Sequence, residues 1–265
     1  MSESPPTTPA AASASASGAA TLPASASGGP KAAPNDIFLD DASRMSRRQV
    51  QRYIEARNEA DVLEAFQLAQ HLGIPITARG KAHAMGGHSM GPGIVLSLRH
   101  MSHVAVDVEG GKLTAQAGAT WAEVLQAANR HARSVPTLQS YAGFSLGGSI
   151  AVNIHGVSSD ATLAESILAL RVLTADGRVL DCPHPSLQED QEAETAVLFR
   201  HVVGGLGLCG IVLSVTLRLC SNVLLDSDTM LLTPAEFDHV HTQVREAPDV
   251  ELKLARYVMA LPTST

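Results

Sequence analysis

Two short stretches rich in glycine carry residue types that bind an anion through the backbone. They are Arg79-Gly80-Lys81-Ala82-His83-Ala84-Met85-Gly86-Gly87-His88-Ser89 and Gly143-Phe144-Ser145-Leu146-Gly147-Gly148-Ser149. Small residues let several amide N–H groups approach one anion, and successive amides in a turn form a concave anion site without a net positive protein. One such stretch alone is equally typical of a simple turn. Two of them, the second followed by Asn153, His155 and Gly156, could grip one extended ligand with a pyrophosphate from both sides.

A third stretch, Gly205 to Gly210, matches the dinucleotide fingerprint G-x-G-x-x-G. That motif binds a pyrophosphate only when it leaves a strand and opens a helix. Here the order is reversed, because residues 196–203 look helical and the alternation over 211–219 predicts a strand. The sequence therefore argues against a Rossmann fold, and no GxxxxGK[ST] sequence indicates a P-loop.

Other chemistry-bearing residues lack the required spacing. His83 and His88 are five apart with no third ligand at helical spacing, so we expect no metal site. Cys182, Cys209 and Cys220 are an odd number without CxxC spacing, so we expect no disulfide framework and interpret them as reduced, mostly buried thiols. No G-x-S-x-G or HExxH motif is present. The catalytic residue is left unassigned.

The elements around the first glycine-rich stretch predict a βαβ unit. A strand over 53–56 precedes Asn58, a good N-cap, and an apolar helical pattern then runs to Gly73 and Pro75. A buried strand over 74–78 follows, which predicts a parallel pair with its ligand at the carboxyl ends of the strands. We expect the first ordered unit to start near Val50.

The remaining pattern predicts two layers of mixed α and β structure. A strand is expected over 94–98 and a hairpin over 104–108 and 113–117. Thr120 and Glu123 form a capping box for a helix. Asp176 and Gly177 provide the tight turn of a second hairpin, over 167–174 and 178–180.

Composition limits the classes of partner and compartment. The 265 residues are 45% hydrophobic and 17% charged, with a net charge of -7, which favours a globular protein and disfavours nucleic acid as partner. No apolar run is long enough for a membrane span, and we expect a cytoplasmic location. Residues 1–36 are almost all Ala, Ser, Pro, Thr and Gly, which predicts a disordered tail. A transit peptide is the alternative, but the stretch has no Arg and contains Glu3.

Three motifs in a fixed order carry a resemblance to a known family. They are Arg79-Gly80-x-x-His83-x-Met85-Gly86-Gly87, then Leu146-Gly147-Gly148-Ser149 with Asn153-x-His155-Gly156, and finally Gly204-Gly205-x-Gly207-x-x-Gly210-Ile211-Val212. With these motifs, residues 53–219 resemble the FAD-binding domain of the vanillyl-alcohol oxidase and p-cresol methylhydroxylase (PCMH-type) flavoproteins.

The resemblance implies an α+β fold of two α+β subdomains that hold FAD extended between them. It places the domain at 46–220, with subdomains of about 46–118 and 119–220, the first loop at the pyrophosphate and residues 210–212 at the adenine end. His83 aligns with a histidine that many members join covalently to the flavin, although it could also be only a loop residue. The cofactor-binding residues that the resemblance implies are Arg79, Gly80, Lys81, Ala82, His83, Ala84, Met85, Gly86, Ser145, Gly147, Gly148, Ser149, Asn153, His155, Gly156, Gly210, Ile211 and Val212.

The sequence also departs from the family pattern. Lys81 and Ala82 replace residues that are usually glycines, Ala84 replaces a usual serine, and Cys209 stands where an aromatic is common. The family's substrate domain usually follows at similar length, whereas here residues 221–265 read as a remnant of such a cap. We expect there a strand over 228–232, a helix capped by Thr233 and a strand over 252–259.

The predicted function is an FAD-dependent oxidoreductase, an oxidase or dehydrogenase that transfers hydride to FAD. By analogy with the family, its small-molecule substrate is an alcohol, a sugar lactone or a hydroxy acid. The alternatives are a truncated, catalytically silent flavin-binding or interaction protein, and a gene fragment. The sequence does not indicate which oligomeric state the protein has or which electron acceptor it uses.

Overall fold

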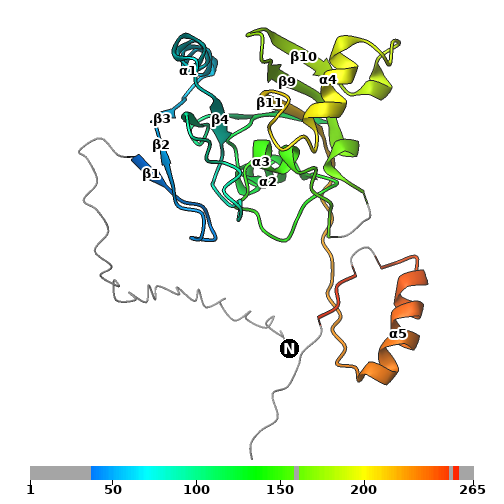
Figure 1. Ribbon diagram of the computed structural model, residues 1–265. Helices are drawn as coiled ribbons and strands as arrows, with labels where there is room; N and C mark the ends of the chain where they lie inside the picture. Colours follow the sequence, from blue (N-terminus) through cyan, green and yellow to red (C-terminus); the bar gives the residue numbers. More distant parts are fainter. Residues whose placement is uncertain (1–36, 158–160, 251–252, 257–265) are drawn as a thin grey trace, which may run out of the picture. The chain divides into compact units, whose positions relative to one another are not determined.

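A small parallel sheet begins the fold in the computed structural model, which describes residues 37–157, 161–250 and 253–256 (Figure 1). Its strands β3 (Arg52–Glu55), β5 (Ile94–Ser97) and β4 (Ile76–Arg79) lie in the order β3-β5-β4, all parallel. Helix α1 (Glu59–Leu72) connects β3 to β4. The expected strand, helix and strand are confirmed, but β3 and β4 are not neighbours. Strand β5 lies between them, because all four of its residues are buried and it needs a partner on each side.

Helix α1 begins and ends where its capping residues predict. The side chain of Asn58 accepts a hydrogen bond from the amide of Asp61, 3.0 Å away. Gly73 adopts a left-handed conformation with φ of 62° and closes the last turn. These caps set the length of the helix, and so position the strand that leads into the first glycine-rich stretch.

A hairpin that the sequence analysis missed precedes this sheet. Strands β1 (Ile37–Leu39) and β2 (Arg48–Val50) pair antiparallel, so the ordered structure starts before Val50. Strands of three residues are too short to show an alternation of apolar and polar residues. The connection between them, residues 40–47, contacts the first glycine-rich stretch. The amide of Ala42 donates to the carbonyl of Ala82 at 3.0 Å.

Three further hydrogen bonds join this hairpin to residues 79–90, two through side chains of the hairpin and one through the side chain of Arg79. The Asp41 carboxylate accepts from the amide of Gly87 at 2.8 Å, and the guanidinium of Arg48 donates to the carbonyl of Met90 at 3.0 Å. The guanidinium of Arg79 donates in the other direction, to the carbonyl of Asp40. The β1–β2 hairpin therefore acts as a clamp on residues 79–90.

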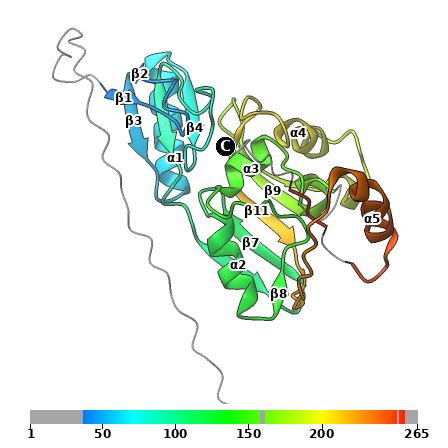
Figure 2. The same cartoon turned by 90° about the horizontal axis from the view of Figure 1, so that it is seen from below.

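The second part of the fold is an antiparallel sheet of five strands in the order β10-β9-β11-β7-β6. Both predicted hairpins are confirmed, as β6 (Val104–Asp107) with β7 (Lys112–Gln116) and as β9 (Ile167–Leu173) with β10 (Val179–Pro183). Strand β11 (Ile211–Arg218) pairs with both β7 and β9. The first hairpin thus belongs to this sheet, although the sequence analysis placed residues up to 118 in the first subdomain. Figure 2 shows the two groups of elements, which confirm an α+β fold.

Three helices accompany this sheet. They are α2 (Trp121–Asn129), α3 (Leu146–Ala151) and α4 (Glu194–Val202), with 3-10 turns at Leu163–Ser166 and Pro185–Leu187 and a short pair β8 (Arg133–Ser134) with β12 (Cys220–Ser221). The capping box of Thr120 and Glu123 is confirmed. The second glycine-rich stretch is not wholly a loop, because α3 begins at Leu146. The amides of Leu146 and Gly147 donate to the carbonyls of Ala119 and Ala117, both at 2.8 Å, which fixes the start of α3 on the strand end.

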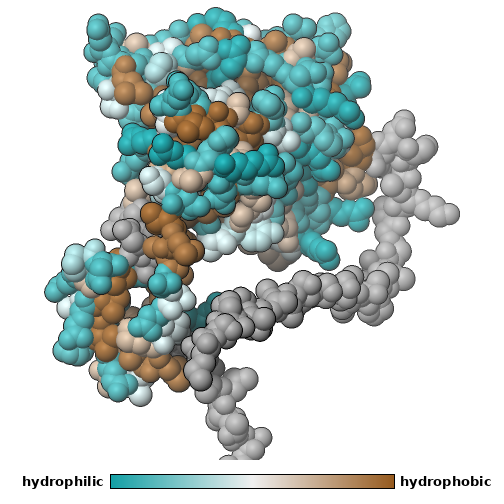
Figure 3. All heavy atoms as spheres, turned by 180° about the vertical axis from the view of Figure 1, so that it is seen from behind, coloured by the Kyte–Doolittle hydropathy of each residue, from teal (hydrophilic) through white to brown (hydrophobic). Residues whose placement is uncertain are grey.

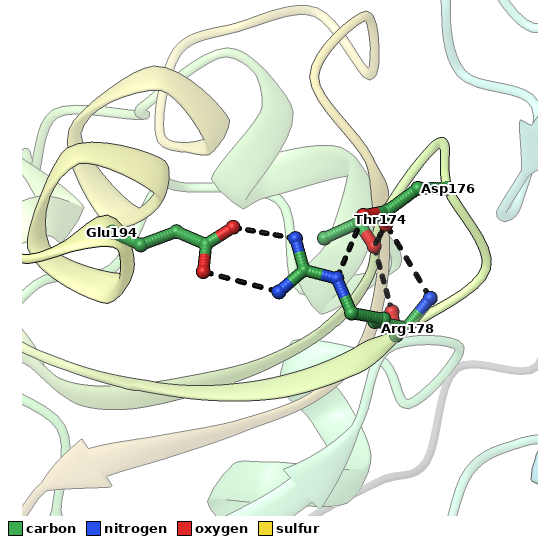
Figure 4. A network of polar contacts seen from close by, with 4 residues as sticks. All are labelled: Thr174, Asp176, Arg178 and Glu194. Carbon is green, nitrogen blue, oxygen red and sulfur yellow. Dashed lines mark hydrogen bonds and ion pairs between the residues drawn. The ribbon is translucent and has the colours of Figure 1, made fainter.

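The β9–β10 hairpin is joined to α4 by a polar network (Figure 4). Arg178 donates through its Nε to Asp176 and through both terminal nitrogens to Glu194, at the start of α4. The hydroxyl of Thr174 donates to Asp176 as well. The Thr174 hydroxyl and then Arg178 lower the pKa of Asp176 to about 2, so its carboxylate is ionised at neutral pH.

The segment after β12 differs from expectation. Residues 228–232 form no strand, because no described segment pairs with them. Of the strand expected over 252–259, residues 253–256 are not in a strand either, and the other four residues lie outside the described ranges. The predicted helix is present as α5 (Pro234–Glu246), with the capping box of Thr233 and Glu236. Apolar residues gather on this segment, at the lower left of Figure 3. Its exposed apolar side chains are Val223, Leu224, Leu225, Met230, Leu231, Phe237 and Leu254. None of the helices in the described ranges is both long and apolar enough to cross a bilayer.

The clamp should weaken in acid through one carboxylate. Hydrogen bonds from the Ser43 hydroxyl and the Gly87 amide hold the pKa of Asp41 below its ordinary value. Because the pKa is lower in the folded than in the unfolded chain, Asp41 stabilises the fold above the unfolded pKa of about 3.9, and this is lost as the pH falls through the folded pKa. Asp41→Asn, which can turn an amide donor toward Gly87, should lower the free energy of unfolding at pH 6.

The measurement is denaturant unfolding of both proteins between pH 6 and pH 3. The difference between wild type and Asp41→Asn should shrink as the pH falls below about 4. Glu64→Gln, an exposed change in α1 whose carboxylate bonds to no described residue, is the control and should show no such trend. A difference that stays constant with pH would contradict the role of the Asp41 carboxylate.

Candidate functional site

The three glycine-rich stretches meet around one cavity of about 400 Å³. Its walls come from residues 78–89 after β4, from residues 144–154 in and around α3, and from residues 202–212 before and at the start of β11. More than 45 residues separate each stretch from the next in the chain. Strand β4 leads into the first stretch, α3 lies in the second, and β11 begins within the third.

Most of the predicted site residues line this cavity, and four do not. Those that line it are Arg79, Gly80, Lys81, Ala82, His83, Ala84, Met85, Ser145, Gly147, Gly148, Ser149, Gly210, Ile211 and Val212. Those outside its lining are Gly86, Asn153, His155 and Gly156. The structure therefore brings together the core of each motif and leaves out the end of the second one.

Three of the residues outside the lining, Asn153, His155 and Gly156, shape the chain that follows α3. Asn153 has φ of 46°, a left-handed conformation that asparagine tolerates, and its side-chain oxygen accepts from the amide of Ala164 at 3.0 Å. The ring of His155 lies 2.9 Å from the carbonyl oxygen of Gly156. These interactions are with the protein itself, so the three residues hold a turn behind the cavity wall.

The first glycine-rich stretch presents a run of unpaired amides. From Gly80 to Gly86, no amide N–H donates to any residue in the described ranges, whereas that of Gly87 is taken by Asp41. Six of these seven residues line the cavity. These N–H groups are accessible at the cavity wall, and an anion with several oxygens can accept from more than one of them.

Charge favours an anion in the same place. Arg79 is 8% exposed, and its guanidinium donates to the carbonyl of Asp40 and, at 3.5 Å, to the hydroxyl of Ser89. Burial lowers the pKa of Arg79, but an arginine stays protonated in proteins. Lys81 also lines the cavity, and its lining residues, all described, include no aspartate or glutamate. The lining residues therefore carry two cations and no carboxylate, while Asp40 and Asp41 interact with the charge of Arg79 from behind the wall.

Close packing sets the width of the cavity at Gly80. A Cβ atom at this position would collide with the hydroxyl oxygen of Ser145, from the stretch before α3. Only glycine lets the first and second stretches approach this closely. Beneath them, the indole Nε1 of Trp121, which is fully buried, donates to the hydroxyl of Ser149 at 2.9 Å.

An aromatic corner surrounds His83. Its ring contacts Tyr141 and Phe144 edge-on, with ring centroids 5.2 Å and 5.0 Å away. The Nδ1 atom is buried and has no hydrogen-bond partner among the described residues. A buried polar atom without a partner costs stability unless a ligand or water satisfies it, so His83 is a position where a ligand is expected.

The sequence analysis missed the apolar wall and part of the rim. The additional lining residues are Ala78, His88, Ser89, Leu98, Ala117, Gln139, Phe144, Ala151, Val152, Ile154, Val202, Leu206, Gly207 and Cys209. Most are ordinary apolar residues that carry no sequence signal of a site. Cys209 is exposed and Cys220 partly so, whereas Cys182 is buried, so the expectation of mostly buried thiols was wrong; all three are free.

Comparison with known proteins matches residues 50–183, half of the chain, to the family described as FAD binding domain. The chain belongs to this family, and FAD is its cofactor. The cavity fits that group, because its positive amide-rich wall suits a diphosphate and its apolar wall suits the ring systems.

The curated relatives extend this finding. An uncharacterized oxidoreductase ORF5 in the fasciation locus of Rhodococcoides fascians is 28% identical over 76% of this chain and 49% of the relative. A D-lactate dehydrogenase of Archaeoglobus fulgidus is 27% identical over 70% and 43%. An L-gulonolactone oxidase of Bos taurus is 24% identical over 74% and 43%. The match thus covers less than half of each of these relatives.

Ala82 gives a test of the backbone of the first stretch. It has φ of 62°, where an L-residue other than glycine is strained by about 1–2 kcal/mol. Ala82→Gly should relieve this strain, partly offset by the greater entropy of glycine in the unfolded chain, for a net gain of about 0.5–1 kcal/mol. The measurement is the free energy of unfolding in denaturant.

Ala84→Gly is the matched control in the same stretch. Ala84 is half-buried and does not have a positive φ, so glycine there should lower the free energy of unfolding by about 0.4–1 kcal/mol. The two changes are therefore expected to have opposite signs. Equal losses in both variants would show that Ala82 is not held in the left-handed conformation.

Proposed function

We propose that this chain forms the FAD-binding part of an oxidoreductase that oxidises a CH–OH group of a small molecule. The observation that carries the proposal is the run of unpaired amides from Gly80 to Gly86 at the wall of a positive cavity. The names of the relatives support the same class, since they include a D-lactate dehydrogenase and an L-gulonolactone oxidase. The substrate is accordingly a hydroxy acid, a sugar lactone or another alcohol.

The proposed division of roles follows the cavity wall. The amides of residues 80–85 hold the diphosphate of FAD, and buried Arg79 adds positive charge behind them. Ser145, Gly147, Gly148 and Ser149 form the facing wall, and Gly210, Ile211 and Val212 line the adenine side. Gly86, Asn153, His155 and Gly156 contribute by shaping the loops and not by lining the cavity.

When bound, FAD supplies a hydride acceptor at the N5 atom of its ring system. The residues of this chain bind and orient the cofactor, and the apolar side chains of Ala151, Val152 and Ile154 keep water from part of the cavity. No carboxylate lines the described cavity, so we assign no proton acceptor for the substrate to this chain.

FAD binding is tested directly by absorbance. The chain, incubated with FAD and desalted, should retain the visible absorption of flavin. Gly80→Ala should weaken FAD binding by about tenfold or more, since a Cβ there collides with Ser145 and must push the two walls apart. Gly111→Ala changes a turn glycine outside the cavity and should leave FAD binding unchanged. A folded wild-type chain that stays colourless would overturn the proposed function.

We further propose His83 as the attachment residue for a covalent flavin, on the strength of its buried, unpartnered Nδ1. After acid precipitation, the pellet of the FAD-loaded chain should stay yellow, and that of His83→Ala should be colourless. His88→Ala, which alters the other histidine of the cavity lining, is the control and should keep the colour. Release of all flavin from the wild-type pellet would overturn the covalent bond and leave reversible FAD binding untouched.

A further inference from the structure

Lys81 differs from the other cavity residues because its side chain is charged, exposed and without a hydrogen bond or ion pair to any described residue. We propose that the Lys81 ammonium forms an ion pair with the diphosphate of FAD, which makes FAD binding by this chain sensitive to ionic strength. The inference rests on the proposed function. It concerns a charged side chain that lies within the run of unpaired amides.

The interactions of Lys81 support this role. Its side chain is exposed, lines the cavity, and makes no hydrogen bond or ion pair with any residue in the described ranges. The other cation of the stretch, Arg79, is already engaged with the carbonyl of Asp40 and is buried. Lys81 is thus the cation of this wall that is available to an anion.

Its place in the chain selects the diphosphate over other anions. Lys81 lies within the run of unpaired amides, with Gly80 before it and Ala82 after it. An oxygen-rich anion that accepts from these amides is necessarily close to the Lys81 backbone, and the flexible four-carbon stem lets the ammonium reach it. A substrate carboxylate has only two oxygens, and so matches a run of several amides less well than a diphosphate does.

A contact from the Lys81 ammonium to an anion is charge-assisted, and is therefore roughly twice as strong as a neutral hydrogen bond. Unlike a buried donor, an exposed ammonium is screened by salt.

The test measures the Kd of FAD by fluorescence titration, in a His83→Ala background so that flavin binds reversibly. At low ionic strength Lys81→Gln should weaken FAD binding about fivefold, the upper end of the range for an exposed ion pair. At about 0.5 M salt the difference should fall to about twofold or less, because the Debye length shrinks. Lys81→Arg should restore binding. Lys112→Gln, an exposed lysine of β7 outside the cavity lining, should bind FAD like its parent.

Binding of other ligands distinguishes loss of the Lys81 charge from a change in the shape of the cavity. Riboflavin, which lacks the diphosphate, should bind the parent and Lys81→Gln equally. Inorganic pyrophosphate should compete with FAD more strongly in the parent, whereas lactate at equal ionic strength should not compete. Equal weakening of FAD and riboflavin, an unchanged Kd for FAD, or competition by lactate alone would overturn the inference. A parent that binds no FAD at all would instead overturn the proposed function, and this inference with it.

Discussion

The site depends on hydrogen bonds between the β1–β2 hairpin and the loop after β4, whose own residues 80–86 donate no backbone hydrogen bonds within the described ranges. Residues 80–86 leave seven consecutive amides without a partner among the described residues. The hairpin fixes this loop at both ends, through Arg79 on the carbonyl of Asp40 and through Gly87 on the carboxylate of Asp41, and at the carbonyl of Ala82 through the amide of Ala42. These bonds use none of the seven amide N–H groups, which leaves them free for an anion.

A second constraint is the close approach of walls that are distant in the chain. Gly80 faces Ser145 with no room for a Cβ, and Gly147 lies against Ala117 at the end of β7. These two glycines therefore set how closely the loop approaches the stretch before α3, and how closely α3 approaches the end of β7. The same arrangement explains why an acidic protein can offer a positive cavity, since backbone amides and two cations suffice locally.

Local signals in the sequence predicted most of the fold and the centre of the site. The caps of α1 and α2, the turn at Gly177 and the three glycine-rich motifs all depend on neighbouring residues, and the structure has them where expected. What depends on distant partners was not predictable. Strand β5 between β3 and β4, the pairing of β7 with β11 and the clamp on residues 79–90 arise from contacts across 40 to 100 residues. The apolar lining, such as Val152 and Leu206, has no local signature at all.

The central place of β11 in the five-stranded sheet also bears on how the cavity comes into being. Strand β11 pairs Leu217 with Leu113, more than a hundred residues earlier, and the cavity wall continues from its first residues. Contacts this far apart in the chain close late during folding, because the intervening loop must first lose its entropy. All three walls of the cavity come together only when residues 78 through 212 are present, so no shorter stretch of this chain contains the complete cavity.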